Sequence, residues 1–480
     1  CGDSVRNVMG CHLAGACPHE HLDISAWADA AYRHFVRNPI AQRLPRKFKI
    51  NFSGCETDCG QAMFNDIGVV ASSRPVVTGE GGEGEAGDGR VELGFRVFVA
   101  GGLGANPFPA LLLEDFTSRE DLLPTLESIL RVFHQTGNRD NKLRARMKWV
   151  VQTLGWEETQ RRILKERKFL LASNSWPGGI PPEVEKAGDA PAGVAVGITP
   201  TPVGQGIPVS ITSRDPYARW DEANVVRGAA KGTVSAIAYA KLGDITVDQF
   251  RALGSIQREL GATVRLTNRQ NLAFRDLTEE QLPQLHRRLE VLGMAEPGAE
   301  LTRDVVSCPG ADTCNLAVTQ SRGLADAISA RLEEEGLAEI GGVRTNISGC
   351  TNSCGQHHIS DIGFSGAERR AHGQSAPGYT MLLGGYVGQT EVHFGERALR
   401  LPAKAAPEAT VRMVRRFADE RQAGETFRGW IDRCGGVKEL ATSLKDLDAF
   451  PTPDEAPDFY VDFGETGPYA AETGESECAT

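Results

Sequence analysis

The sequence has no long hydrophobic run and has fewer basic than acidic residues. No stretch of about 18 consecutive apolar residues occurs, so no segment is predicted to span a membrane. Lys and Arg total 52 against 63 Asp and Glu, and the net charge of −11 argues against a general nucleic-acid binder. The opening residues lack the basic segment and apolar stretch of a secretory signal. We therefore expect a cytoplasmic protein.

Cysteine is also scarce, with 11 among 480 residues, which excludes a disulfide scaffold. The chain is 40% hydrophobic and 24% charged, which excludes a collagen, a coiled-coil rod and a wholly disordered chain. No flavin or nicotinamide motif is recognisable, because GGLG at 101–104 is only a weak glycine signal. The length predicts a globular protein of about two to four domains. Because no such motif is present, the electrons for any redox reaction of this protein would come from a separate donor protein.

Eight of the cysteines are arranged in two sets that repeat the same spacing. The first set is Cys11, Cys17, Cys55 and Cys59, and the second set is Cys308, Cys314, Cys350 and Cys354. In each set five residues separate the first two cysteines and three separate the last two. NFSGCETDCGQAMFNDIG at 51–68 matches NISGCTNSCGQHHISDIG at 346–363, an offset of 295. A shared apolar run before a glycine-rich turn follows at 95–107 and 379–391, so an internal duplication is predicted.

The duplication divides the chain into a mixed α/β (α+β) arrangement. The predicted parts are a first repeat at 1–137, a connecting helix at 138–175, a linker at 176–208, a half-domain at 209–298, a second repeat at 299–450 and an acidic tail at 451–480. Within the half-domain we predict a strand near 231–245, a helix at 246–260, a second strand at 261–277 and a second helix capped by Thr278. The duplication also predicts a matching half-domain before Cys1, which this sequence does not contain.

Thiolates at these spacings indicate a metal centre. Zinc sites usually use two cysteines separated by two residues, because one tight turn then directs both sulfurs at a single ion. The gaps here are wider and favour a four-iron four-sulfur cluster. From spacing alone, zinc and buried structural thiols remain alternatives.

CPGADTC at 308–314 followed by NISGCTNSCG resembles the signature of the sirohaem-containing sulfite and nitrite reductases. CGDSVRN, LPRKFK, GGLG, NRDNKLRARMKW and RLTNRQN resemble the same family in its order along the chain. The resemblance implies an internally duplicated sulfite-reductase-like fold with a ferredoxin-like half-domain and sirohaem between two α/β repeats. It also implies that the second set binds the cluster and that Cys354 bridges the cluster to the haem iron.

Basic residues are expected to hold the cofactor and the substrate. Sirohaem carries many carboxylates, and the basic motifs supply partners for them, although from composition alone these motifs would be solvated surface charges. The resemblance implies cofactor contacts from Arg46, Arg144, Arg146, Lys148, Arg265, Thr267, Gln270, Asn271 and Asn352. It places Arg6, Lys47 and Lys49 on the substrate side. In an extended LPRKFK segment Lys47 and Lys49 lie on one side, and their repulsion is tolerable when an anion binds between them.

The leading functional hypothesis is a ferredoxin-dependent, assimilatory sulfite reductase that reduces sulfite to sulfide with six electrons. Its nearest rival is a nitrite reductase on the same cofactors; in the family resemblance Lys49 favours sulfite, because the nitrite branch more often has Asn there. A third hypothesis is a non-catalytic electron-transfer subunit that binds clusters. The first set is predicted to hold a second cluster, with relict thiols and zinc as alternatives. One catalytic sirohaem is expected, because Gly342 and Arg344 occupy the positions equivalent to Lys47 and Lys49.

Overall fold

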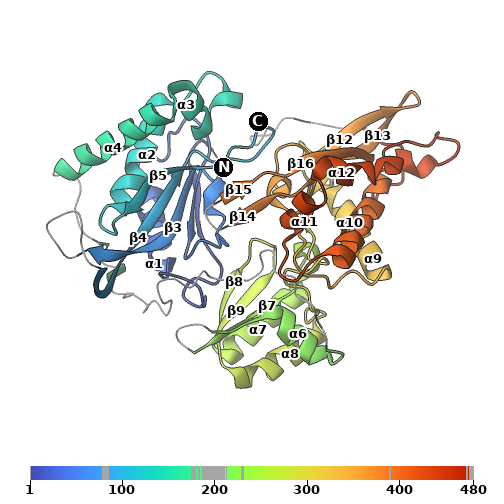
Figure 1. The fold of residues 1–480 in the computed structure, drawn as a ribbon, viewed down its shortest axis with the longest axis horizontal. Helices are drawn as coiled ribbons and strands as arrows, with labels where there is room; N and C mark the ends of the chain where they lie inside the picture. The colour runs from blue at the N-terminus through green and yellow to red at the C-terminus, as the bar shows by residue number, and fades with distance from the viewer. Residues whose placement is uncertain are drawn as a thin grey trace.

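The computed structural model has two large α/β units side by side and a smaller unit below and between them (Figure 1). The structure describes residues 2–77, 86–173, 180–181, 184–185, 211, 213–228, 232–388, 391–471 and 474. The two large units contain the predicted repeats, and the smaller unit contains the half-domain. Most of the predicted linker at 176–208 lies outside the described residues.

The first repeat is built on one five-stranded sheet. Its strands, in their order across the sheet, are β1 (Val5–Gly10), β2 (Phe48–Ser53), β3 (Ile67–Val77), β4 (Ala86–Val99) and β5 (Leu111–Thr117). Helices α1 (Ser25–Val36) and α2 (Leu122–Thr136) pack their apolar faces into its core. Trp27 and Phe133, one from each helix, are at most 1% exposed, so the core lies between these helices and the sheet.

The second repeat has a sheet of the same kind. Its strands, in order, are β10 (Val306–Ser307), β11 (Thr345–Ser348), β12 (Ile362–Ala371), β13 (Gln374–Leu383) and β16 (Glu396–Pro402). Its helices are α9 (Ser321–Glu334), α10 (Ala406–Glu420), α11 (Phe427–Arg433) and α12 (Val437–Thr442). In both sheets the first three strands are parallel and the remaining two pairings are antiparallel. This shared order and direction confirms the predicted duplication and the mixed α/β fold class.

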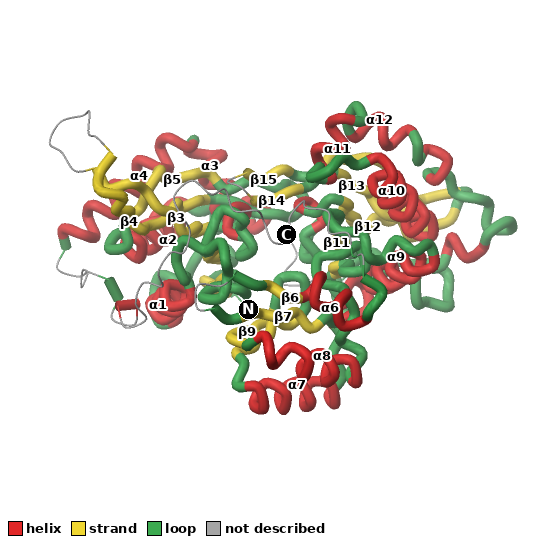
Figure 2. The backbone as a smooth tube through the Cα atoms, turned by 60° about the horizontal axis from the view of Figure 1, so that its bottom comes forward, coloured by secondary structure: helices red, strands yellow, loops and turns green. Residues whose placement is uncertain are grey.

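The half-domain is a four-stranded antiparallel sheet with the helices at 247–260 and 282–291 on the face turned away from the repeats (Figure 2). Its strands, in order, are β6 (Val225–Val226), β7 (Val234–Ala238), β9 (Leu272–Leu277) and β8 (Thr263–Leu266), and its helices are α6 (Pro216–Asn224), α7 (Val247–Leu260) and α8 (Leu282–Val291). Thr246 caps α7 in a capping box with Gln249. The single strand expected at 261–277 is instead the β8–β9 hairpin, because the chain turns through Gln270 at φ +66°.

The segment expected to form one connecting helix forms two. These are α3 (Met147–Leu154) and α4 (Trp156–Ala172), which meet at Gly155 with φ +82°, a conformation that interrupts a helix. Ile163 and Leu170 of α4 are at most 1% exposed, and Ile163 belongs to the core of the first repeat. The segment therefore packs onto the first repeat rather than bridging the two repeats.

The two repeats are joined by a ribbon and a reciprocal side-chain contact. Strands β14 (Tyr386–Gly388) and β15 (Glu391–His393) form a two-stranded ribbon that reaches from the second repeat toward the first (Figure 1). An apolar cluster of residues from both repeats includes Val387 of this ribbon. Gln61 and Gln356, which are 295 positions apart, donate to each other, with both Nε2–Oε1 distances 2.6 Å.

The described residues of the tail, 451–471 and 474, pack against the second repeat. Tyr460 is 4% exposed, the Asp462 carboxylate accepts from the Gln320 backbone N–H at 2.9 Å, and the Tyr469 hydroxyl donates to the Val318 carbonyl at 2.7 Å.

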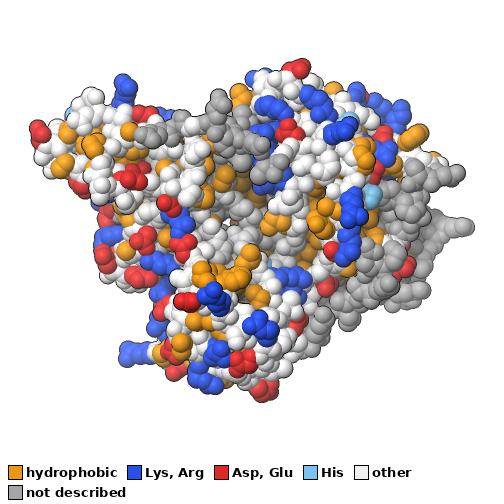
Figure 3. Space-filling view, turned by 180° about the vertical axis from the view of Figure 1, so that it is seen from behind, with side chains coloured by type: hydrophobic (Ala, Val, Ile, Leu, Met, Phe, Trp, Pro, Cys, Tyr) orange, Lys and Arg blue, Asp and Glu red, His pale blue; other side chains and the backbone are white. Residues whose placement is uncertain are grey.

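On the face seen from behind, basic and acidic side chains are interspersed (Figure 3). Across the described part of the chain, every helix is too short or too polar to cross a membrane.

Candidate active site

A central cavity of about 710 Å³ lies where the two repeats and the half-domain meet. Its basic side chains come from the first repeat and are Lys47, Lys49, Arg144, Arg146 and Lys148. The second repeat contributes residues 351–354, including Asn352 and Cys354, and the half-domain contributes Asn268. Seven predicted site residues are thus brought to one cavity. Its size and its ring of cations suit a large anionic ligand.

Lys47 and Lys49 reach the cavity because strand alternation separates them from Phe48. Phe48, the first residue of β2, is fully buried in the core of the first repeat, so its two neighbours point the other way. The Lys49 side chain is open to the cavity, but the surrounding protein still lowers its pKa by desolvation, and the charge of Arg146 lowers it further. An ammonium of lowered pKa gives up its proton more readily, so Lys49 is suited to proton transfer as well as to anion binding.

A buried carboxylate fixes the orientation of these cations. Arg146 forms a bidentate ion pair with Asp66, with N–O distances of 2.7 and 3.1 Å, and the Asp66 side chain is fully buried. Asp66 also accepts from the Lys49 backbone N–H at 3.0 Å. Lys148 donates to the backbone carbonyls of Leu103, within the GGLG turn, and of Asn106, just after it, and burial lowers its pKa to about 8. The basic wall is therefore positioned by the protein itself.

The second cysteine set lies at one edge of its sheet. Cys308 follows β10 and Cys350 follows β11, and because these strands are parallel their carboxyl ends meet at the same edge. The Gly349 N–H donates to the Cys308 sulfur at 3.2 Å. The Cys354 side chain is exposed to the cavity, but desolvation by the surrounding protein raises its pKa to about 11, and the neighbouring thiols of Cys308 and Cys350 act in the same direction. The proximity of these thiols is what a shared cluster requires, and Cys354 faces the central cavity.

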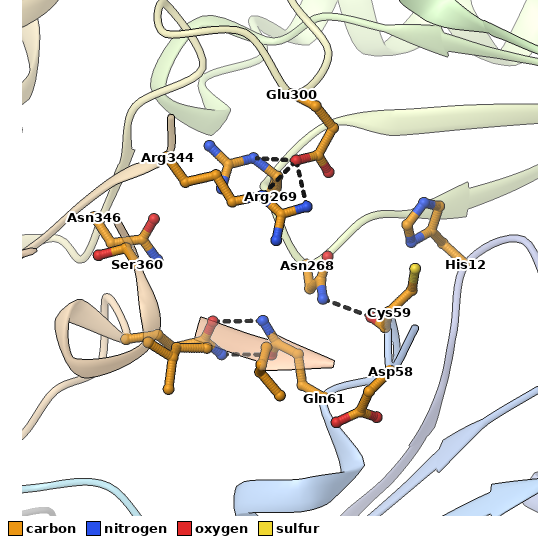
Figure 4. A pocket seen from close by; sticks show the side chains of 13 residues that line it. His12, Asp58, Cys59, Gln61, Asn268, Arg269, Glu300, Arg344, Asn346 and Ser360 are labelled. Atoms are coloured by element: carbon orange, nitrogen blue, oxygen red, sulfur yellow. Dashed lines mark hydrogen bonds and ion pairs between the residues drawn. The ribbon is translucent and has the colours of Figure 1, made fainter. Parts of the chain in front are cut away.

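The equivalent pocket on the other side of the interface is almost filled. It measures about 30 Å³, enough for about one or two waters, and Cys59 lines it as Cys354 lines the central cavity. Glu300 accepts from Arg344 at 2.7 Å and lies 3.6 Å from the Arg269 Nε, so three charged side chains occupy the space (Figure 4). The pocket has no room for a tetrapyrrole. Here Arg344 stands at the position of Lys49.

Six of the residues predicted to contact the cofactor or the substrate lie elsewhere in the described part of the chain. They are Arg6, Arg46, Arg265, Thr267, Gln270 and Asn271, and they are not among the residues that line the central cavity. The Arg6 Nε donates to the Gly2 carbonyl at 3.0 Å, and Arg46 lies 3.5 Å from Asp3. The charge of Arg6 still contributes to lowering the pKa of Lys49. Its substrate role remains a prediction.

The predicted half-domain residues have structural contacts instead. Arg265 donates to the Ala14 carbonyl at 3.1 Å, near the first cysteine set. The Thr267 hydroxyl accepts from the Asn271 N–H at 3.1 Å within the hairpin turn, and Gln270 donates to the Ser307 carbonyl at 3.0 Å. Their cofactor role remains a prediction.

Sequence reasoning did not select Asn268, which stands between these residues in RLTNRQN. Asn268 lines both the central cavity and the equivalent pocket, and its Nδ2 donates to the Cys59 carbonyl at 2.7 Å. Its place in a basic, amide-rich turn was the available signal. The sequence alone did not indicate which side chain of that turn reaches the cavity.

A cysteine loop beside a cavity lined with cations suits an iron–sulfur oxidoreductase that binds an anionic ligand. The family model described as the nitrite and sulphite reductase 4Fe-4S domain matches residues 1–169 and 298–446, and the model of the nitrite/sulfite reductase ferredoxin-like half domain matches 229–292. The chain belongs to this family. The resemblance seen in the sequence motifs is thereby confirmed.

Two relatives and one solved structure are similar to this chain over most of its length. An assimilatory ferredoxin-dependent nitrite reductase of Haloferax mediterranei is 28% identical over 442 residues, covering 90% of this chain and 69% of that protein. A sulfite reductase [ferredoxin] of Mycobacterium tuberculosis is 26% identical over 443 residues, covering 90% of this chain and 70% of that protein. The structure of the Mycobacterium tuberculosis NirA protein matches with a TM-score of 0.68 at 24% identity, covering 92% of this chain and 72% of that chain, and has the same fold.

Members of this family use sirohaem and a four-iron four-sulfur cluster, and the residues of this chain fit both. The five cations of the central cavity match a macrocycle with many carboxylates, and the volume admits one. The thiols of the second set supply the ligands that a cluster needs.

Proposed function

We propose that this chain is a ferredoxin-dependent sulfite reductase that reduces sulfite to sulfide with six electrons. The observation that carries the proposal is the position of Lys47 and Lys49, which face the same central cavity as Cys354. A doubly charged anion gains more from two adjacent ammonium groups than a singly charged one does. Both curated relatives described above are named for ferredoxin, which supports a ferredoxin as the electron donor.

The cofactors are assigned to opposite walls of the cavity. Arg144, Arg146 and Lys148 would hold the carboxylates of sirohaem, and the second set would hold the cluster, with Cys354 nearest the haem iron. When bound, this coupled centre supplies the electrons and the iron to which the substrate binds. Asn352, whose backbone N–H contacts the Cys350 thiol, would help to stabilise the thiolate charge.

Lys47 and Lys49 supply protons for the reaction. Each S–O bond that breaks releases an oxygen that must be protonated, and Lys47 and Lys49 hold protons at their Nζ atoms toward the cavity. Burial and the charge of Arg146 lower the pKa of Lys49, which makes it a readier proton donor than an ordinary lysine. Asp66 keeps Arg146 in place, so the cationic wall does not rearrange as charge moves.

Nitrite is the second candidate substrate. The nitrite reductase of Haloferax mediterranei is 28% identical, slightly above the 26% of the sulfite reductase. The residues that favour sulfite over nitrite are the paired lysines, and Lys49 is the discriminator.

A substrate assay on the holoenzyme tests the proposal. Protein purified anaerobically and loaded with sirohaem and cluster should consume sulfite with reduced ferredoxin and release sulfide, with a higher kcat/KM for sulfite than for nitrite. Lys241→Ala, at an exposed lysine paired with Asp326 at 2.6 Å, is the matched control and should behave as wild type. A higher kcat/KM for nitrite would reverse the assignment. Loaded protein that turns over neither anion would favour an electron-transfer subunit.

A further inference from the structure

The first cysteine set has no part in the proposed reaction, yet its four cysteines lie around one small cavity. Cys11, Cys17, Cys55 and Cys59 all line this cavity, which measures about 10 Å³ without a ligand. The thiols of Cys17 and Cys55 are hydrogen-bonded to each other. Cys11 and Cys55 follow the parallel strands β1 and β2, so the sheet edge brings the two loops together as it does in the second repeat.

The loops of the two sets share one hydrogen-bond frame. The matching contacts are Cys11 N to Phe52 O and Cys308 N to Ile347 O (both 3.1 Å), Asn51 Nδ2 to Gly60 O and Asn346 Nδ2 to Gly355 O (2.8 and 2.9 Å), and Gly60 N to Ser53 Oγ and Gly355 N to Ser348 Oγ (both 3.0 Å). A Cβ at Gly60 or Gly355 would overlap a carbonyl oxygen, so the same close approach requires glycine in both loops.

Backbone N–H groups also face the sulfurs in the same way. The matching contacts are the Gly54 N–H with the Cys11 thiol and the Gly349 N–H with the Cys308 thiol, and the Thr57 N–H with the Cys55 thiol and the Asn352 N–H with the Cys350 thiol. Such donors stabilise the charge on thiolates that bind a cluster. Buried thiols with only a packing role would not need this pattern to be preserved 295 positions away.

The spread of the thiols argues against a single metal ion. Across the residues that the structure describes, no three His, Cys, Asp or Glu side chains gather closely enough to hold one ion, and this applies to both cysteine sets. In the family to which this chain belongs, the resemblance assigns a four-iron four-sulfur cluster to the second set. Because the first set is spaced and framed in the same way, it suits the same larger object better than zinc.

Two arginines of the half-domain supply positive charge next to the first set. Arg275 is 4% exposed and donates to the Ala14 carbonyl at 2.6 Å, while its Nε and Nη1 have no hydrogen-bond partner among the described residues. Arg265 donates to the same carbonyl at 3.1 Å. Glu20 lines the thiol cavity and is held by the Gly15 N–H at 2.8 Å. The charge of Asp23 acts on both Arg265 and Glu20, so Asp23 and Glu20 together offset the two guanidinium groups.

We propose that Cys11, Cys17, Cys55 and Cys59 bind a second four-iron four-sulfur cluster, one without an adjacent haem. The equivalent pocket beside Cys59, at about 30 Å³, is too small for a tetrapyrrole. Asn268 contacts the Cys59 carbonyl and also lines the central cavity, so this cluster lies on the half-domain side of the haem site. The proposal does not depend on whether sulfite or nitrite is reduced.

Metal and acid-labile sulfide analysis of the unmodified chain tests the proposal. Protein purified anaerobically should contain about eight cluster irons and about eight sulfides per chain, in addition to the sirohaem iron. About four of each would overturn the proposal. So would zinc bound at the first set, or a Cys17–Cys55 disulfide found by mass spectrometry. An absence of turnover would leave the iron count unchanged, so this test is separate from that of the proposed function.

Variants then assign the irons to the two sets. Cys350→Ser/Cys354→Ser should retain about four cluster irons and a paramagnetic signal on reduction, held by the first set, and Cys11→Ser/Cys55→Ser should retain the four of the second set. Cys434→Ser, at a cysteine outside both sets, should keep all eight. If Cys350→Ser/Cys354→Ser folds but loses all cluster iron, the proposal is wrong. If a double variant does not fold, the spin count of the reduced wild-type protein distinguishes one cluster from two.

Discussion

The central cavity and the equivalent pocket occupy corresponding sides of one interface, but the first measures about 710 Å³ and the second about 30 Å³. Lys47 and Lys49 stand on the open side, whereas Gly342 and Arg344 stand on the filled side. On the filled side Glu300 supplies the negative charge that Arg344 requires. On the open side a bound anion can supply the negative charge that Lys47 and Lys49 require. A few charge changes on a common frame thus separate a binding site from a packed interface.

Replacing the cysteines that face the two sides should give the largest difference. Cys354→Ser should abolish turnover and weaken retention of sirohaem, because it removes the thiol between the cluster and the cavity. Cys59 faces the equivalent pocket, so the Cys59→Ser variant should retain sirohaem. Absorbance bands of the haem and turnover with reduced ferredoxin measure both effects. Full activity with unchanged spectra in Cys354→Ser would rule out its assignment as the bridging ligand.

The two equivalent aspartates should also respond differently. Asp66→Asn removes the buried partner of Arg146, and breaking such a pair costs about 3 to 5 kcal/mol. We expect a lower free energy of unfolding and weaker sirohaem retention. Asp361→Asn, at the equivalent position, should leave sirohaem retention near that of wild type, because Asp361 accepts from the Arg344 backbone N–H at 2.8 Å on the filled side and does not hold a cation of the central cavity. Equal loss of sirohaem in both variants would contradict the distinction.

The substrate cations should show a smaller effect. Lys47→Ala and Lys49→Ala should each lose about 1.5 to 3 kcal/mol of transition-state stabilisation, or roughly 10- to 150-fold in kcat/KM, because one charge-assisted bond is removed. Lys49→Asn should shift preference toward nitrite. Arg344→Lys places a lysine at the equivalent position on the filled side and should change kcat/KM by less than about twofold. Unchanged selectivity in Lys49→Asn would mean that other residues choose the anion.

A pH effect should distinguish Lys148 from the arginines of the same wall. Burial lowers the pKa of Lys148 from 10.5 to about 8 in the protein without ligand, so its ammonium is charged below pH 8 and increasingly neutral above it. Affinity for the carboxylates of sirohaem should therefore fall as the pH rises above about 8. Dialysis at pH 7, 8 and 9 followed by haem absorbance measures this loss. Lys148→Arg should flatten the profile, and an equally steep profile in that variant would exclude Lys148 as the cause.

Local spacing predicted most of the fold and much of the site. The cysteine gaps and the 295-residue offset predicted the duplication, and strand alternation around Phe48 predicted that Lys47 and Lys49 share a side. These features depend on residues close together in the chain or on a repeated pattern. The β8–β9 hairpin was missed because its turn uses Gln270 in a left-handed conformation, which is rare for a residue with a side chain.

Contacts between segments that are distant in the chain could not be predicted from the sequence pattern. Asn268 reaches the cavity because the half-domain docks beneath both repeats, and the filling of the equivalent pocket depends on Glu300, which stands 44 residues before Arg344. The break at Gly155 turned one expected helix into two and placed α4 on the first repeat. Tertiary packing decided the positions of Asn268 and Glu300, which no local pattern encodes, whereas the glycine at 155 was a local signal for the helix break.

The reciprocal bond between Gln61 and Gln356 has the geometry of a contact across a twofold axis, where one residue meets its own copy in a symmetric dimer. In a dimer of identical chains every substitution occurs on both sides of the axis, so neither side can be hollowed while the other is filled. Joining the two copies in one chain removes that constraint. The covalent link between the repeats is thus what permits Lys49 on one side and Arg344 on the other, and the glutamine pair marks the point where the original symmetry persists.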